Sequence, residues 1–206
     1  MTTMNLSKVN SIKRLLDKSG EMEHVKRYSI RVVHEKQSVA AHSALVGVVS
    51  CCLGEFLNDF NDNEVIDIKL TSTLALFHDL EETDLGDILL TTKKNKIIKT
   101  EYDILAKTFY NEFLNPVRPD LMSAMFDESL TKDFLKLSDK MEGYLFSYRQ
   151  VKFYNNVTFY DIFFSYYDTL KTLMKALQEK YPNVKGWQEL FDTFIRPYKT
   201  ELAMRR

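Results

Sequence analysis

A short segment, Leu74-Ala75-Leu76-Phe77-His78-Asp79-Leu80-Glu81-Glu82, joins an apolar run to side chains that can bind a metal ion. The run ends directly at His78 and Asp79. Burying a histidine beside an aspartate costs free energy unless both are paired, and a shared divalent cation would pair both. A His-Asp pair alone also occurs by chance, as a hydrogen-bonded pair at a helix end. Its meaning therefore depends on which other residues the chain places beside it.

Two further ligand-type residues lie in segments that otherwise look like protein core. His42 begins a strongly apolar run after Ser38, and Asp139 is flanked by apolar positions such as Leu137 and Met141. With His78 and Asp79 they make two imidazoles and two carboxylates from three predicted helices. This mixed donor set suits one divalent transition ion, namely Mn²⁺, Co²⁺, Fe²⁺, Ni²⁺ or Zn²⁺. Four protein ligands leave room on a six-coordinate ion for water and a phosphate oxygen.

The rest of the chain predicts an all-α fold. Only 6 Gly and 4 Pro occur in 206 residues, which favours long helices with few interruptions. Apolar residues recur at helical spacing, and Ser38 is the expected N-cap of the second helix. The predicted helices are 6–16, 38–60, 65–78 with its end near Glu82, 97–113, 131–153, 159–180 and 187–202. No internal repeat or Gly-rich linker appears, so residues 1–206 are expected to form a single-domain helical bundle.

The connections are predicted from turn and breaker residues. Ser19-Gly20 should end the first helix, and 21–36 should form a loop. A second loop is expected at 84–90 around Gly86, and Pro116 and Pro119 should break the chain.

Composition excludes several kinds of partner. The net charge of −1 argues against a protein that coats a nucleic acid polymer or an acidic membrane. Residues 1–11 lack the apolar core of a signal peptide, and no run approaches the ~18 apolar residues of a membrane span. Cys51 and Cys52 are adjacent and form no disulfide framework. We expect buried or half-buried thiols on a helix and a cytoplasmic protein.

The ordered set His42, His78-Asp79 and Asp139 resembles the H…HD…D signature of the HD-domain phosphohydrolases. The resemblance covers residues 27–148 and is greatest to the bacterial 5′-deoxynucleotidase branch. One departure stands out, because Ala41 occupies the position of a family Glu for which an orienting role is plausible. The segments that carry the resemblance are Arg27-Tyr28 (42 − 27 = 15 residues before the first His), Val39-Ala40-Ala41-His42-Ser43, His78-Asp79-Leu80-Glu81-Glu82 and Leu85-Gly86-Asp87.

The resemblance implies roles for the surrounding residues. Glu82 lies four positions after His78 (82 − 78 = 4), which is one helical turn, and is expected to act as general base or acid. Asp87 is the second catalytic carboxylate. Arg27 and Lys93 would bind phosphate. The alternative for Arg27 and Lys93 is an ordinary surface charge, and the alternative for Glu82 and Asp87 is a solvated helix end. His24 and His34 are expected at the surface.

Three functions remain open. The first is a 5′-deoxynucleotidase, with Tyr28 packing on the sugar or base. The second is a deoxynucleoside triphosphohydrolase, with dATP first and Mg²⁺ accompanying the triphosphate; small viral enzymes of this kind resemble the same branch, and Tyr28-Ser29-Ile30 would then read the base. The third is a degenerate HD-fold regulatory module. The resemblance also implies a homodimer or higher homo-oligomer, in which the aromatic helices of 159–202 provide core packing or an interface.

Overall fold

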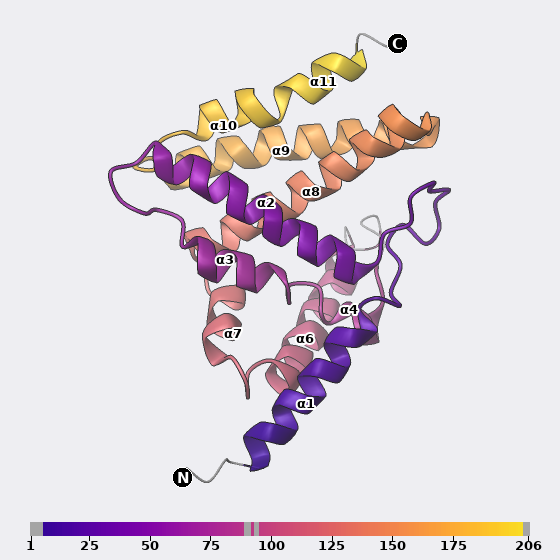
Figure 1. Cartoon of the computed structure of the whole chain (residues 1–206), viewed down its shortest axis with the longest axis vertical. Helices are drawn as coiled ribbons and strands as arrows, with labels where there is room; N and C mark the ends of the chain where they lie inside the picture. Colours follow the sequence, from indigo (N-terminus) through magenta and orange to yellow (C-terminus); the bar gives the residue numbers. More distant parts are fainter. Residues whose placement is uncertain (1–5, 89–91, 93–94, 204–206) are drawn as a thin grey trace.

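Two long helices cross at the centre of the fold, α2 (Val39–Asp59) and α8 (Leu130–Tyr154) (Figure 1). The computed structural model describes residues 6–88, 92 and 95–203. The short helix α3 (Ile68–Ala75) packs against both central helices. On the other side of α8 lies α9 (Tyr160–Lys180), reached through the 3₁₀ turn η1 (Val157–Phe159). Helices α10 (Trp187–Phe194) and α11 (Arg196–Ala203) complete this layer.

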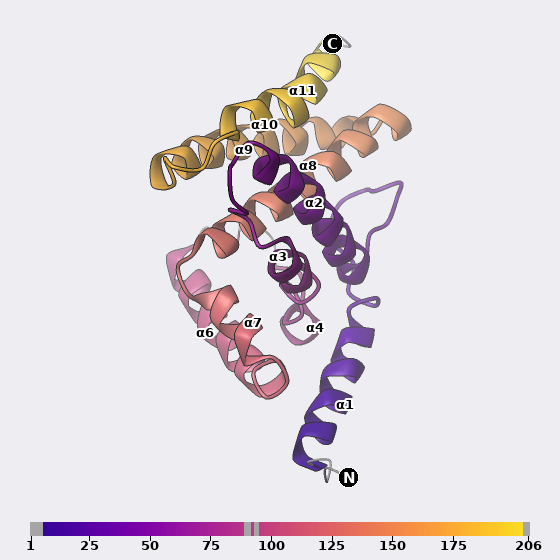
Figure 2. The ribbon, with the colours of Figure 1, turned by 60° about the vertical axis from the view of Figure 1, so that its left-hand side comes forward.

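The remaining helices form the opposite end of the molecule. They are α1 (Leu6–Glu21), α4 (Glu82–Leu85), α6 (Lys96–Phe113) and α7 (Pro119–Phe126). Figure 2 shows α6 and α7 below α3, whereas α1 extends away toward the N-terminus. Among the residues of α1, only Leu15 is buried. This helix therefore depends on its contact with α6 more than on a core of its own.

Two clusters of buried apolar side chains hold these layers together. The larger one contains Tyr144 of α8 and Phe163 of α9, and the smaller one contains Leu74 of α3 and Tyr110 of α6. Both α2 and α8 contribute to both clusters. The prediction of an all-α fold is confirmed: within the described residues, the extended pairing consists of an isolated bridge between Lys26 and Ser38.

The helix predicted over 65–78 is shorter than expected, and the difference places the His-Asp pair in a turn. Asp67 caps the start of α3 by accepting from the backbone N–H of Leu70 at 2.8 Å. After Ala75 the backbone tightens into hydrogen bonds three residues apart. Tyr110 binds there, with its hydroxyl 2.8 Å from the carbonyl oxygens of both Phe77 and His78. The Tyr110 hydroxyl thus contacts the turn that follows α3.

Other predicted boundaries were also wrong. Helix α1 continues through Ser19-Gly20 to Glu21, and the loop expected at 84–90 begins at Gly86, because Asp84 and Leu85 belong to α4. Leu89 and Leu90 lie outside the described residues. Pro119 opens α7 instead of only breaking the chain, since the first helical position needs no backbone N–H.

The C-terminal region also differs from its prediction. The single helix expected over 187–202 is divided at Ile195 into α10 and α11.

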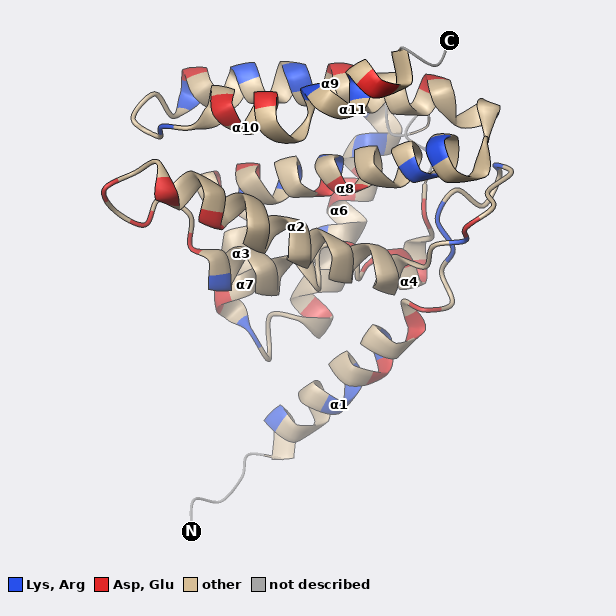
Figure 3. Ribbon diagram, turned by 45° about the horizontal axis from the view of Figure 1, so that its top comes forward, with Lys and Arg blue, Asp and Glu red and all other residues tan. Residues whose placement is uncertain are grey.

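Helix α2 carries an apolar face that is not covered. The two thiols predicted to be buried or half-buried, Cys51 and Cys52, are both exposed, because they project from the side opposite the buried Leu53 and Gly54. The helix has the length and mean hydropathy (1.6) of a membrane-crossing segment, and Figure 3 shows few charges along it. It packs against α3 and α8 as the central helix of the fold.

Candidate metal centre

Three separate elements present the four predicted metal ligands. His42 lies in the first turn of α2, which Ser38 caps by accepting from the Ala41 N–H at 3.1 Å. His78 and Asp79 lie in the turn that follows α3, and Asp139 lies in the middle of α8. The first turn of α2 is therefore fixed by its cap, and the His-Asp turn is fixed by Tyr110.

The structure brings all four side chains together. Ligand atoms of His42, His78 and Asp139 lie within 4.8 Å of one another. His42 Nε2 is 3.2 Å from Asp139 Oδ1 and 3.5 Å from Asp79 Oδ2. His78 Nε2 lies 3.3 Å from the same oxygen of Asp79. Two imidazole nitrogens thus face two carboxylates across a space small enough for one ion.

The other nitrogen of each imidazole is already engaged. His78 Nδ1 lies 2.7 Å from the carbonyl oxygen of Ala75, which can only accept, so Nδ1 carries the proton. His42 Nδ1 lies 2.6 Å from Glu142 Oε2. Among the described residues, neither Nε2 atom has a hydrogen-bond partner, although both are buried. Unpaired nitrogens beside carboxylates are what a divalent metal would satisfy, so the residues present fit such an ion.

The charges of the centre reinforce one another. Burial opposes ionisation of Asp139, but Lys140, with Nζ 2.5 Å away, and His42 hold the pKa of this carboxyl well below its usual range. Burial also opposes ionisation of Asp79, and His78 and His42 lower its pKa. For His42, burial and Arg27 favour the neutral ring, yet the surrounding carboxylates raise its pKa. Both aspartates are therefore anionic and ready to bind a cation.

Sequence reasoning missed Glu142, whose carboxylate is only 1% exposed. Besides His42, it accepts from Gln37 Nε2 at 2.8 Å and from Arg27 NH1 at 3.4 Å. A signal was present in the sequence, because Glu142 follows Asp139 by three positions and so shares its helix face.

Two predicted substrate and catalytic segments also meet. The backbone N–H of Tyr28 donates to Asp87 Oδ2 at 3.3 Å, and the N–H of Arg27 donates to the carbonyl of Gln37 at 3.0 Å. Tyr28 has a φ of +56°, a left-handed conformation that is rare for a residue with a large side chain. The 27–37 loop is thus tied both to the Gly86 loop and to the start of α2.

The Tyr28 ring packs inward. It stacks on Phe146 with ring centroids 5.1 Å apart, and its hydroxyl lies 3.2 Å from the hydroxyl of Tyr166 on α9. Tyr166 fits because α8 has a glycine opposite it: a Cβ on Gly143 would lie 2.5 Å from the Tyr166 ring. In contrast, the Ile30 side chain is 68% exposed. In the Tyr28-Ser29-Ile30 run, the Tyr28 ring is therefore packed against other aromatic rings, whereas the Ile30 side chain is exposed.

The remaining predicted residues are placed as follows. Glu82 is buried, but it begins α4 and does not lie one turn along a common helix from His78 as expected. Its backbone N–H donates to the carbonyl of Asp79 at 3.1 Å, so it stays close to the pair through a turn. Lys93 lies outside the described residues. His24 and His34 are exposed, as predicted.

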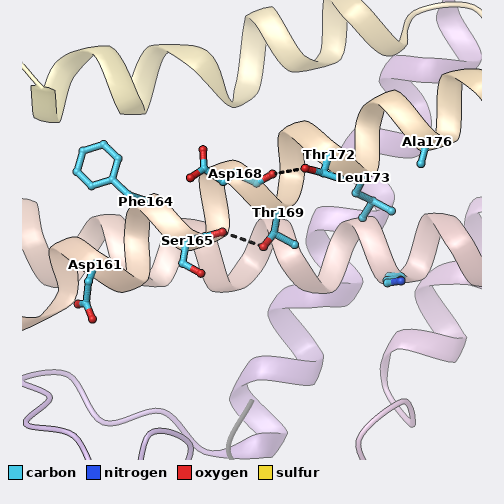
Figure 4. Close-up of a pocket in the computed structure, with 9 residues that line it drawn as sticks. Asp161, Phe164, Ser165, Asp168, Thr169, Thr172, Leu173 and Ala176 are labelled. Carbon is cyan, nitrogen blue, oxygen red and sulfur yellow. Dashed lines mark hydrogen bonds between the residues drawn. The ribbon is translucent and has the colours of Figure 1, made fainter. Parts of the chain in front are cut away.

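A groove of about 810 Å³ lies elsewhere, on the outer face of α9 (Figure 4). Its lining includes Asp161, Phe164 and Asp168. The hydroxyls of Thr169 and Thr172, which also line it, donate to carbonyl oxygens of their own helix at 2.8 and 2.9 Å. No histidine lines this groove, so the four predicted ligands are the better candidate for the functional site.

Comparison with known proteins agrees with this centre. A family model described as YfbR-like 5′-deoxynucleotidase matches residues 15–191, which include all four ligands. Comparison with curated proteins gives no match.

Solved structures share the fold. A protein from Pyrococcus horikoshii has a TM-score of 0.65 and 22% identity, over 85% of this chain and 99% of its own. An HD-domain phosphohydrolase from Listeria innocua has a TM-score of 0.63 and 21% identity, over 92% and 99%. The HD phosphohydrolase of cyanophage S-2L, bound to dA and one catalytic Zn²⁺ ion, has a TM-score of 0.57 and 17% identity, over 89% and 96%.

Proposed function

The chain belongs to the YfbR-like 5′-deoxynucleotidase family, a group of nucleotide phosphohydrolases, and from this membership we propose its reaction. It hydrolyses deoxynucleoside 5′-monophosphates to the deoxynucleoside and phosphate. The observation that carries the proposal is the pair of buried Nε2 atoms of His42 and His78, which lie close to Asp79 and Asp139 without a well-aligned hydrogen bond. A divalent transition ion held by these four residues would polarise a phosphate oxygen and lower the pKa of a water molecule.

The acidic side chains next to the centre supply proton transfer. Glu82 follows Asp79 within one turn and is buried, so we assign it to orient the attacking water and accept its proton. The new bond joins the water oxygen to phosphorus, and the bond from phosphorus to the 5′ oxygen breaks. We assign Asp87, on the Gly86 loop, to deliver the proton that the departing 5′ oxygen takes up.

Arg27 is the residue we assign to the phosphate. Its guanidinium has a planar, two-pronged set of donors that matches phosphate oxygens. Glu142 holds it beside His42, with 3.4 Å between the Arg27 and Glu142 atoms. The other described cations of the centre, Lys140 and Arg149, lie against carboxylates of Asp139 and Glu142. One half-buried arginine suits a single phosphate better than a triphosphate.

A deoxynucleoside triphosphohydrolase, with dATP as its first substrate and Mg²⁺ accompanying the triphosphate, is the second candidate. It is supported by Arg31 and Lys36, two exposed cations on the 27–37 loop that also carries Arg27. They would take the outer phosphates, and the exposed side chain of Ile30 would contact the base.

A hydrolysis screen separates these functions. The protein is loaded with Mn²⁺, Co²⁺ or Mg²⁺ and offered the four deoxynucleoside monophosphates and the four triphosphates, with phosphate and triphosphate measured separately. Phosphate from the monophosphates is the expected result. Triphosphate from dATP would establish the second candidate, and no product from any substrate with metal bound would favour a regulatory nucleotide-binding module.

A further inference from the structure

We propose that Glu142 is a positioning residue for the metal centre, which fixes the His42 imidazole with its proton on Nδ1 and holds Arg27 beside it. The part concerning His42 depends only on the metal centre. The part concerning Arg27 rests on the proposed function.

Donors converge on both oxygens of this carboxylate. Oε2 lies 2.6 Å from His42 Nδ1 and 3.4 Å from Arg27 NH1. Oε1 accepts from Gln37 Nε2 at 2.8 Å, and Arg149 NH2 lies 3.7 Å from it. The side chain therefore acts as an acceptor at both oxygens.

This arrangement determines the His42 tautomer. An ionised carboxylate can only accept, so His42 must present an N–H at Nδ1. The lone pair then lies on Nε2, which faces Asp79 and Asp139. Glu142→Gln would replace one carboxylate oxygen with an NH₂ group, which is itself a donor. That group would face either Gln37 Nε2 or His42 Nδ1. Either the contact with Gln37 or the contact with His42 would be lost.

The support comes from across the fold and not from the residue that precedes His42. The preceding residue, Ala41, is exposed and offers only a methyl group, where the resemblance expects a glutamate. Glu142 instead reaches His42 from α8, one helical turn beyond Asp139. One helix thus provides both a metal ligand and the group that orients a second ligand. Because His42 and Arg27 contact the same oxygen, movement of Glu142 would displace both.

The test compares metal binding by the metal-free, full-length protein and its variants. Calorimetric titration with Mn²⁺ should give an affinity for Glu142→Gln that is about 10- to 100-fold weaker than for the wild type, the usual effect of losing such a partner. The matched control is Asp133→Asn, which removes a carboxylate of the same helix that binds Lys180 and Tyr181 and none of the proposed ligands. This control should bind Mn²⁺ as the wild type does. Equal affinity of Glu142→Gln and wild type would overturn the proposal.

A second measurement needs no variant, so it stands even if Glu142→Gln fails to fold. Nitrogen-15 NMR of the metal-free wild type, at a pH where the ring is neutral, reports which nitrogen of His42 carries the proton. We expect Nδ1, and a proton mainly on Nε2 would refute the assignment. Neither measurement uses a nucleotide, so a wrong choice of substrate leaves both results interpretable. For Arg27, Glu142→Gln saturated with metal should raise the KM for the nucleotide, whereas Asp133→Asn should not.

Discussion

At the scale of single residues, the proposed metal ligands and the proposed proton acceptor are different side chains. His42, His78, Asp79 and Asp139 face one another, whereas Glu82 is buried on the next turn, where its backbone N–H donates to the carbonyl oxygen of Asp79. A side chain that does not bind the ion can be removed without removing the ion.

Substitution of these two groups should therefore have different effects. His78→Ala and Asp79→Ala should abolish both Mn²⁺ binding and hydrolysis. Glu82→Ala should retain Mn²⁺ but lose about 100- to 10,000-fold in kcat, the range typical of general acid–base catalysis. Metal content and turnover are measured on the same samples. Turnover of Glu82→Ala at the wild-type rate would show that another group accepts the proton.

The raised pKa of His42 gives opposite pH dependences with and without metal. In the metal-free protein, the protonated ring stabilises the fold below its unfolded-state pKa, near 6.5, and this stabilisation disappears as pH rises through the higher folded-state value. A metal ion needs the neutral ring, so its affinity rises with pH over the same range.

Thermal unfolding of the metal-free protein between pH 6 and 8.5 checks the predicted loss of stability. Calorimetric titration with Mn²⁺ over the same range checks the metal affinity. That affinity should increase by about tenfold per pH unit below the His42 pKa, since one proton is released for each ion bound. The exposed residue His34 provides the control, because His34→Ala should leave the profile unchanged. An affinity that does not vary with pH would mean that His42 is neutral throughout.

The sequence reveals the four ligands because each is a polar residue within an apolar segment. Glu142 is harder to recognise: its spacing places it on the helix face of Asp139, but it stands between Met141 and Gly143 and looks like an ordinary charged position of a long helix. Its partner His42 is 100 residues away, so only the packing of α2 against α8 assigns it a role.

At the scale of elements, the packing of α8 against α9 depends on one missing side chain. The Tyr166 ring crosses α8 at Gly143, the residue that follows Glu142. Its hydroxyl contacts that of Tyr28, so this crossing also positions the 27–37 loop.

Gly143→Ala should accordingly destabilise the protein by about 1–3 kcal/mol, the usual cost of overpacking a core. Urea unfolding measures the change. Gly20→Ala is the matched control, because nothing lies within 4 Å of its added Cβ on α1 and the change should be neutral or stabilising. In the double variant Gly143→Ala/Tyr166→Ala the clashing ring is absent, so Gly143→Ala should cost much less stability there than in the wild type. If the two changes in the free energy of unfolding simply added, the proposed clash would be contradicted.

Helix interiors were predictable because apolar periodicity is a local property, and α6, α8 and α9 begin and end within two residues of expectation. The ends of the helices were less predictable from the sequence. Ser19-Gly20 does not stop α1, whereas α3 ends at Ala75, where the hydrogen bonds become three residues apart and Tyr110 from a distant helix contacts the turn that follows.

At the scale of the whole molecule, the proposed metal centre lies where the two helices that contribute to both apolar clusters, α2 and α8, meet the turn that follows α3. Its ligands come from α2, the turn after α3, and α8. An ion bound to all of them would stabilise the folded state and not the unfolded chain, in which the ligands are far apart.

Removing the metal should lower the melting temperature. At a free Mn²⁺ concentration of 100 times its Kd, the ion contributes about 2.7 kcal/mol. For a chain of this size that corresponds to a loss of about 5–10 °C when a chelator is added. The His78→Ala protein should show no response to the chelator, and an equal decrease in that variant would place the stabilising ion elsewhere.

The order of the ligands along the chain has a consequence for synthesis. His42, His78 and Asp79 leave the ribosome well before Asp139, which belongs to a helix that ends at Tyr154. The nascent chain therefore has an incomplete ligand set until about two thirds of it has been made. An ion that needs all four proposed ligands would therefore be unable to act as an early template for folding, and it would enter the centre only once α8 had taken its place.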